Sequence, residues 1–238
     1  MNYEKYTYNT SGYSITVPFV LSDDKTDIYI DGEYTTDYQL ATVGSDTVIT
    51  FINLLYPSDT VTIYKYKAIA LQEFKQHLRV TTSFEDDILR FYLDAAITFV
   101  EDLTSIYMYE RDVMEVLEFE LQSERITYNP VNEITYFKKY NHQKGIYEDQ
   151  DYTANLDEKP ATIYLKNDKK YYSKLEQPDK YKIEYKAGSI DFPNQMKIAV
   201  FIYGFGLFEC KGDMQGATKQ RYAKSSTAML NQIKQFTF

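Results

Sequence analysis

The sequence predicts an α+β protein, in which a small β-sandwich is followed by a helical bundle with an inserted β meander and an extended C-terminal arm. Three observations support this fold class. Short segments with alternating apolar residues fill the first part of the chain, apolar residues take helical spacing after Lys67, and residues 196–208 are apolar nearly all round. With 238 residues, 44% of them hydrophobic, the chain can bury a sizeable core.

Four short β segments are predicted in the first part of the chain, at residues 14–19, 27–31, 48–52 and 60–66. Apolar side chains nearly alternate with polar ones in these segments, which is typical of strands with one buried face. Turn signals lie between them, at Asp31 followed by Gly32 and at residues 57–59. We therefore expect residues 1–67 to form a β-sandwich domain.

Residues 68–238 are predicted to form a second domain built on helices at about 69–79, 83–105 and 193–211. Ser83 with Asp86 three residues later is a plausible capping box, and acidic residues there suit the positive end of the helix dipole. The third helix follows Pro193, which is tolerated at a helix start, and should be buried by its neighbours. Gly204 and Gly206 inside it indicate close helix packing or a local bend, because they lack the strand and third glycine of a dinucleotide-binding loop.

Strand-like segments return between about residues 113 and 187, which indicates a β meander. Within it, residues 138–151 contain glycine, asparagine and charges of both signs, as expected for an exposed hairpin loop. Residues 217–238 are polar with isolated apolar side chains, so we expect an extended arm that becomes ordered on a partner. The arm residues expected to contact that partner are Leu230, Ile233, Phe236 and Phe238.

The composition disfavours several classes of function. A net charge of -9 argues against wrapping DNA, because affinity for nucleic acid comes mainly from Lys and Arg at phosphates. The longest apolar run, residues 198–208, is too short to span a bilayer, and the first residues carry no secretory signal, so we expect a cytoplasmic protein. Cys210 is the single cysteine and is expected to be a buried, inert thiol. The 25 tyrosines and 14 phenylalanines provide contact area of the kind enriched at protein interfaces.

No catalytic, cofactor-binding or metal site is predicted. His77 and His142 are the chain's two histidines, and with one cysteine they leave no cluster at zinc-ligand spacing. Both histidines are expected to face solvent or to form local hydrogen bonds. The adjacent acids at residues 23–24, 86–87 and 148–151 are interpreted as solvated charge, because acid/base catalysis needs two carboxyl groups held in different environments.

From about Ala68 onward, short motifs follow one another in the order found in a known family. They are His77-Leu78-Arg79-Val80, Glu85-Asp86-Asp87-Ile88-Leu89, Leu93-Asp94-Ala95-Ala96, residues 99–104, Asn129-Pro130-Val131 with Ile134 and Tyr136, Tyr185-Lys186-Ala187-Gly188, Phe192-Pro193, Lys197-Ile198-Ala199 and Phe208-Glu209. This region resembles the head-to-tail adaptor (head-tail connector) family of tailed phages. One departure is Ser105, because the family usually has glycine where the second helix closes.

A second set of motifs lies in the first part of the chain, at residues 17–24, 28–32, 38, 48–51 and 61–65. This part resembles the N-terminal docking module of podophage tail fibres. The resemblance implies a docking surface for a tail or fibre protein, and the residues expected there are Pro18, Phe19, Asp23, Asp24 and Tyr38. The alternative is a generic small sandwich that only stiffens the subunit.

Together, the resemblances imply a structural virion protein without enzymatic activity, located at the head-tail joint and assembled in the host cytoplasm. By analogy with the family, it would form a ring, dodecameric in the family, between the portal protein and a tail nozzle or tail-fibre protein. The C-terminal arm would contact the portal, and genomic DNA would pass through the lumen without specific binding.

Two alternatives remain for the function. A tail-fibre or receptor-binding accessory protein should be trimeric with a repetitive shaft. A hydrolase of cell-wall sugar should present carboxylates across an aromatic cleft.

Overall fold

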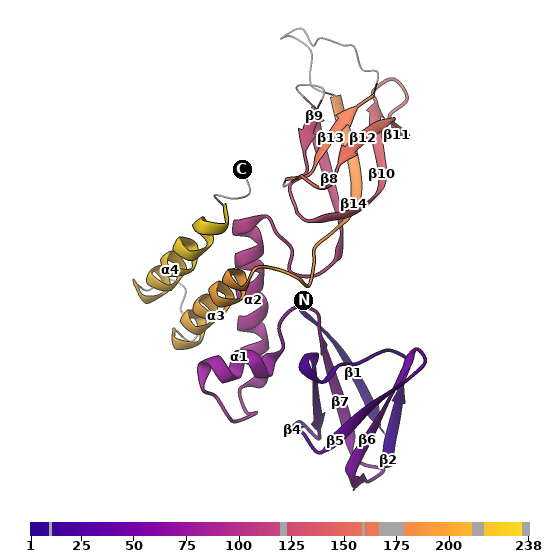
Figure 1. Cartoon of the computed structure of the whole chain (residues 1–238). Helices are drawn as coiled ribbons and strands as arrows, with labels where there is room; N and C mark the ends of the chain where they lie inside the picture. Colours follow the sequence, from indigo (N-terminus) through magenta and orange to yellow (C-terminus); the bar gives the residue numbers. More distant parts are fainter. Residues whose placement is uncertain (10, 120–122, 159, 167–178, 211–216, 235–238) are drawn as a thin grey trace. The chain divides into compact units, whose positions relative to one another are not determined.

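The computed structural model describes residues 1–9, 11–119, 123–158, 160–166, 179–210 and 217–234 (Figure 1). Its helices are α1 (Leu71–Leu78), α2 (Asp86–Thr104), α3 (Asn194–Glu209) and α4 (Ala217–Lys234). Its strands are β1 (Tyr3–Asn9), β2 (Gly12–Val17), β3 (Thr26–Ile30), β4 (Glu33–Thr35), β5 (Tyr38–Val43), β6 (Asp46–Leu55), β7 (Thr60–Tyr66), β8 (Arg111–Phe119), β9 (Ser123–Arg125), β10 (Val131–Asn141), β11 (Ile146–Asp149), β12 (Tyr152–Asn155), β13 (Thr162–Leu165) and β14 (Asp179–Ala187). The predicted α+β class is confirmed.

The chain divides into two compact units. The first unit consists of residues 1–98 and 197–226, so it contains the strands β1 to β7, the helix α1 and most of α2, α3 and α4. The second unit consists of residues 99–196 and 227–238, with the strands β8 to β14.

The strands of the first unit form two antiparallel sheets, ordered β1-β7-β3-β4 and β2-β6-β5. Apolar residues of both sheets meet in one core, which includes Val17, Ile28, Ile49 and Ile63, all fully buried. Asp31 joins β3 to β4 with a φ of 50° and is followed by Gly32, a pair typical of a tight hairpin turn. The alternation of apolar and polar residues did not predict the strands β1, β4 and β5.

The central strands β7 and β3 of the sheet β1-β7-β3-β4 are buried on both faces. Isoleucine and valine fill its inner face, whereas Tyr29, Tyr64 and Tyr66 project from the other face and are 4%, 6% and 3% exposed. Tyr64 lies opposite Asp27 in the antiparallel register of β7 and β3, so this carboxylate shares the tyrosine-lined face. Part of the chain's high tyrosine content therefore serves an internal contact.

The helices of the first unit approach one another closely, and Figure 1 shows α3 between α2 and α4. A Cβ atom on Gly204 would lie 2.7 Å from the Phe74 ring of α1, and one on Gly206 would lie 2.7 Å from Tyr222 of α4. The two glycines therefore permit the close packing that the sequence predicted.

Two expectations about these helices are wrong. Residues 217–234 form the helix α4 instead of an extended arm, and the hydroxyl of its buried Ser226 donates to the Ala199 carbonyl of α3 at 3.2 Å. The helix α3 is not buried all round, because Ile198 is 44% exposed and a neighbouring row of apolar side chains is half-buried. Cys210, at its end, is also half-buried rather than buried.

The second unit contains two antiparallel sheets, ordered β11-β10-β14-β8 and β12-β13-β9, around one core. This order differs from a simple meander, because β14 lies between β10 and β8 although it comes last in the sequence. Its inward residues Tyr181, Ile183 and Tyr185 are fully buried, which suits a central strand. The predicted loop at 138–151 is mostly the paired strands β10 and β11, with residues 142–145 at the turn.

Candidate functional site

The first residue of α2, Asp86, lies in a buried charge pair. Its carboxylate accepts hydrogen bonds from Lys75 of α1 and Tyr29 of β3, each at 2.5 Å. The side chains of Lys75 and Asp86 are each only 4% exposed. The interpretation of Asp86 as solvated charge is therefore wrong, whereas the adjacent Asp87 is 94% exposed as expected.

Arg90 lies one helical turn further along α2 and inserts among the tyrosines of the sheet. Its guanidinium carbon is 3.6 Å from the centre of the Tyr64 ring, and its Nε donates to the Tyr66 hydroxyl at 3.2 Å. Its Nη1 donates to Asp87 at 2.7 Å. The aromatic faces and the Asp87 carboxylate together compensate for burying this cation.

Asp27 of β3 completes the charge set on the sheet and is 1% exposed. Burial raises the pKa of its carboxyl group from 3.8 to about 6, against the opposing effects of a hydrogen bond from Tyr66 and the charge of Arg90. Its Oδ2 atom has no hydrogen-bond partner. Asp27 is therefore an incompletely paired charge in this buried contact between the sheet and α2, as is Arg90, whose Nη2 atom also has no hydrogen-bond partner.

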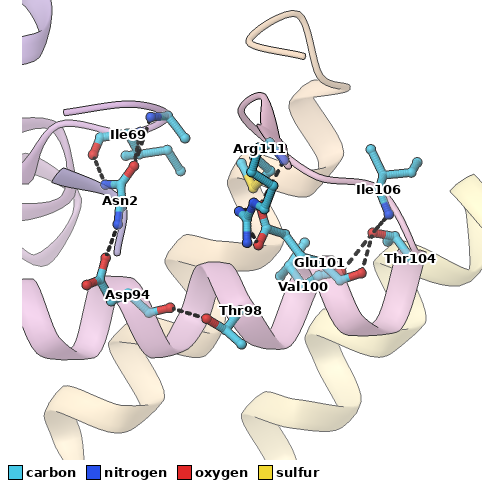
Figure 2. A network of polar contacts seen from close by, with 11 residues as sticks. Asn2, Ile69, Asp94, Thr98, Val100, Glu101, Thr104, Ile106 and Arg111 are labelled. Carbon is cyan, nitrogen blue, oxygen red and sulfur yellow. Dashed lines mark hydrogen bonds and ion pairs between the residues drawn. The ribbon is translucent and has the colours of Figure 1, made fainter. Parts of the chain in front are cut away.

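Asn2 ties the segment between β7 and α1 to α2, as Figure 2 shows. Its side-chain amide donates to the Ile69 carbonyl at 2.6 Å, and its side-chain oxygen accepts from the Ala68 amide at 2.8 Å. Its backbone amide donates to Asp94 of α2 at 2.8 Å. Residues 68–70 are all buried, so the connection between sandwich and helices is a rigid contact and not a free linker.

The C-terminal end of α2 belongs to the second unit and has its own buried carboxylate, Glu101 (Figure 2). Its Oε1 accepts from the Met108 amide at 2.9 Å, and both its oxygens lie 2.8 Å from an Arg111 nitrogen. The Arg111 guanidinium stacks over the rings of Tyr107 and Tyr109, with each ring centre at 4.0 Å. These contacts fix the chain as it leaves α2 for β8.

Ser105 follows α2 with a φ of 55°, in the left-handed region that usually favours glycine. Its amide donates to the Glu101 carbonyl at 2.8 Å, and its carbonyl accepts from Asn129 at 2.9 Å. Ser105 thus has the backbone geometry of a glycine cap, although it stands where the connector family usually has glycine. Gly188 approaches the same region so closely that a Cβ atom would lie 2.1 Å from the Tyr109 carbonyl oxygen.

The residues predicted for tail-side docking lie in different environments on the sandwich. Pro18 and Asp23 are exposed. Phe19 and Tyr38 are half-buried against the sandwich core, and Phe19 stacks on Tyr6 with ring centres 4.2 Å apart. The side chain of Asp24 lies outside the described residues. Their role in docking stays a prediction.

The residues predicted for portal contact do not form an exposed stripe in the described chain. Leu230 is 1% exposed and therefore packs against its own chain. The Ile233 side chain, and Phe236 and Phe238 altogether, lie outside the described residues. The portal contact from these residues stays a prediction.

Both histidines are exposed and in local ring contacts, His77 with Phe201 and His142 with Tyr140. Within the described ranges, no group of three or more His, Cys, Asp or Glu could hold a metal ion. No helix in the described part of the chain is both long and apolar enough to cross a membrane.

Residues 68–130 match the model of the phage gp6-like head-tail connector protein family. This part of the chain is therefore similar to that connector family. The matched residues contain α1 and α2, with Lys75, Asp86 and Arg90 at one end of α2 and Glu101 at the other. No match was found among curated proteins.

Among solved structures, the chain is similar to components of gene transfer agent (GTA) particles. It is 20% identical to a chain in the neck of an empty GTA particle, with a TM-score of 0.49 over 65% of this chain and 89% of that one. A chain of the native GTA virion is 21% identical, with a TM-score of 0.48 over 65% of this chain and 89% of that one. A chain in the neck of the native GTA particle is 19% identical, with a TM-score of 0.47 over 64% of this chain and 86% of that one. At these scores the likeness adds nothing to the assignment of the connector segment.

Proposed function

We propose that the chain is a structural subunit of the head-tail joint of a phage-like particle, forming a ring between portal and tail. The observation that carries this proposal is the connector match over residues 68–130, which coincides with α1, α2 and the buried contacts at both ends of α2. A connector transmits position between two neighbours, so it needs a rigid element held at each end. Charge pairs that are buried and hydrogen-bonded suit this role, because they specify one geometry.

The sandwich supplies the proposed docking surface for a tail or fibre protein. It is fastened to the connector helices through Asn2, Tyr29 and Arg90, so a force on the sandwich would pass directly into α2. A sandwich that only stiffens the subunit would need the same contacts with α2. Substitutions at the exposed Pro18 and Asp23 can distinguish docking from stiffening. Replacing both should prevent tail attachment without loss of stability only if the sandwich docks a partner.

Cryo-electron microscopy of purified particles tests the proposal. Ring density in the neck that accommodates α1, α2 and both β regions is expected. A control particle assembled without this chain should lack that density and should fail to retain its tail. Density at a fibre tip, or a stable trimer of the isolated chain in solution, would instead support the tail-fibre accessory protein.

A further inference from the structure

We infer that neighbouring copies of this chain contact each other through two different apolar surfaces, one on α2 and one on α3 with α4. The inference rests on the proposed ring and assigns the residues that close it. Both surfaces lie within the first compact unit, so a single rigid part of each copy carries both of them.

The first surface is an apolar stripe on α2 and the turn before it, made of Phe84, Ile88 and Phe91, which we call the α2 stripe. These side chains are 97%, 43% and 66% exposed. Ile88 and Phe91 are three residues apart and share one side of α2, and Phe84 lies in the turn two residues before the helix. Two exposed phenylalanines within eight residues of each other are unusual for a surface that faces only water.

The second surface is the partly open side of α3, made of Ile198, Phe201, Ile202 and Phe205, which we call the α3 stripe. Ile198 is 44% exposed and the other three side chains are half-buried, because Phe201 also stacks on His77 of α1 and Phe205 meets the Tyr222 ring of α4. The remaining sides of α3 contact α1 through Gly204 and α4 through Ala199 and Gly206. The α3 stripe also has helical spacing, so its ridges can interdigitate with those of the α2 stripe.

The exposed charges beside the α2 stripe are acidic, whereas those of α4 are basic. Glu85 and Asp87 are exposed beside the α2 stripe. Arg221 and Lys224 are exposed on α4, which contains no acidic residue, and the exposed Glu209 at the end of α3 accepts a hydrogen bond from Tyr222. An α2 stripe that met a second α2 stripe would bring the acids together. An α2 stripe that meets the α3 stripe of another copy pairs acids with bases, which favours this occupant.

Symmetry supports the same pairing. Contact between two identical patches related by a two-fold axis gives a closed dimer. A ring of more than two copies around one axis needs two different, complementary patches on each copy. The α2 and α3 stripes meet this requirement, because they differ in position and in neighbouring charge.

The test measures association of the full-length protein by sedimentation velocity, from low micromolar to near-millimolar concentration. The wild-type chain should form species larger than a dimer as concentration rises. Phe91→Glu on the α2 stripe and Ile198→Glu on the α3 stripe should each weaken association at least tenfold. Val116→Glu is the matched control, because Val116 is 56% exposed on β8 and belongs to neither stripe, so this variant should leave association unchanged. Circular dichroism checks that each variant is folded.

Mixing the two variants distinguishes the proposed contact from a symmetric one. Each variant keeps one intact stripe, so an equal mixture of Phe91→Glu and Ile198→Glu should form heterodimers and nothing larger. A mixture that stays monomeric would overturn the inference, and dimers formed by Ile198→Glu alone would show instead that the α2 stripe packs on itself. Charge reversal gives a second check, because Glu85→Lys or Lys224→Glu alone should weaken association and the double variant should recover it.

Incorporation into particles separates this inference from the proposed function. If the wild-type chain enters the neck and both stripe variants enter it equally well, the ring stands and the stripes do not close it. If the wild-type chain is absent from the neck, the proposed function itself fails. Wild-type oligomers that neither stripe variant weakens also overturn the inference.

Discussion

Replacing Asp86 by asparagine tests whether the joint between the sandwich and the helices is closed to water. The substitution leaves Lys75 buried without its carboxylate, and it removes an acceptor from Tyr29. Removing one partner of a buried ion pair typically costs about 3–5 kcal/mol. Native domains are stable by only about 5–15 kcal/mol, so this loss should be large in urea unfolding followed by circular dichroism.

Two controls separate the buried pair from a general effect of charge. Glu148→Gln removes a carboxylate from a pair with Lys144 at 2.6 Å, but that pair is exposed in the β10–β11 hairpin, so stability should hardly change. The double variant Lys75→Met with Asp86→Asn should regain part of the loss, because no unpaired charge remains. A loss below about 1 kcal/mol for Asp86→Asn would refute the reasoning, since exposed pairs contribute that little.

Three further substitutions test individual features. Asp27→Asn should stabilise the protein at neutral pH, because the pKa of Asp27 is raised from 3.8 to about 6 and wild-type stability therefore falls as pH rises through that window. In urea unfolding, the stability difference between variant and wild type should increase between pH 4 and pH 6 and reach about 3 kcal/mol above pH 6. A difference that does not change with pH would contradict this. Ser105→Gly should raise stability in thermal unfolding by about 0.5–1 kcal/mol, because glycine adopts a φ of 55° without the strain that a side chain causes. Ser225→Gly in the exposed part of α4 should instead lower stability by about 0.5 kcal/mol, and no gain at Ser105 would argue against a strained cap. Gly188→Ala should lower the free energy of unfolding by at least about 3 kcal/mol, because the added Cβ atom would clash with the Tyr109 backbone oxygen. Gly44→Ala should lower it by only about 1 kcal/mol, because Gly44 also has a positive φ but has open space around it. Equal losses would mean that the contact between Gly188 and Tyr109 is not tight.

The buried contact between the sandwich and α2 joins two parts of the chain that the sequence separates. The change of apolar spacing at Lys67 predicts a boundary between two domains. In the structure, residues 1–98 lie in one compact unit, because Tyr29, Tyr64 and Tyr66 of the sheet pack against Asp86 and Arg90 of α2. A change of spacing marks where strands give way to helices, and it says nothing about which surfaces those elements share.

Local patterns in the sequence predicted the elements whose signals are local. The helix α2, the turn at Asp31 and Gly32, and the close packing at Gly204 follow from spacing, turn chemistry and the absence of a side chain. The connector family is also recognisable from motifs within residues 68–130. In each case the information lies within a few consecutive residues, because backbone geometry and turn preference act over that range.

The tertiary structure alone decided which charges are buried and which apolar faces stay open. Asp86 and Asp87 are adjacent and chemically identical, yet one is enclosed by Lys75 and Tyr29 while the other faces solvent. The α4 segment became a packed helix because small residues such as Ser226 fit against α3, a contact that hydropathy does not reveal. Burial depends on partners far away in the sequence, and desolvation sets the energy of a charge only after those partners are in place.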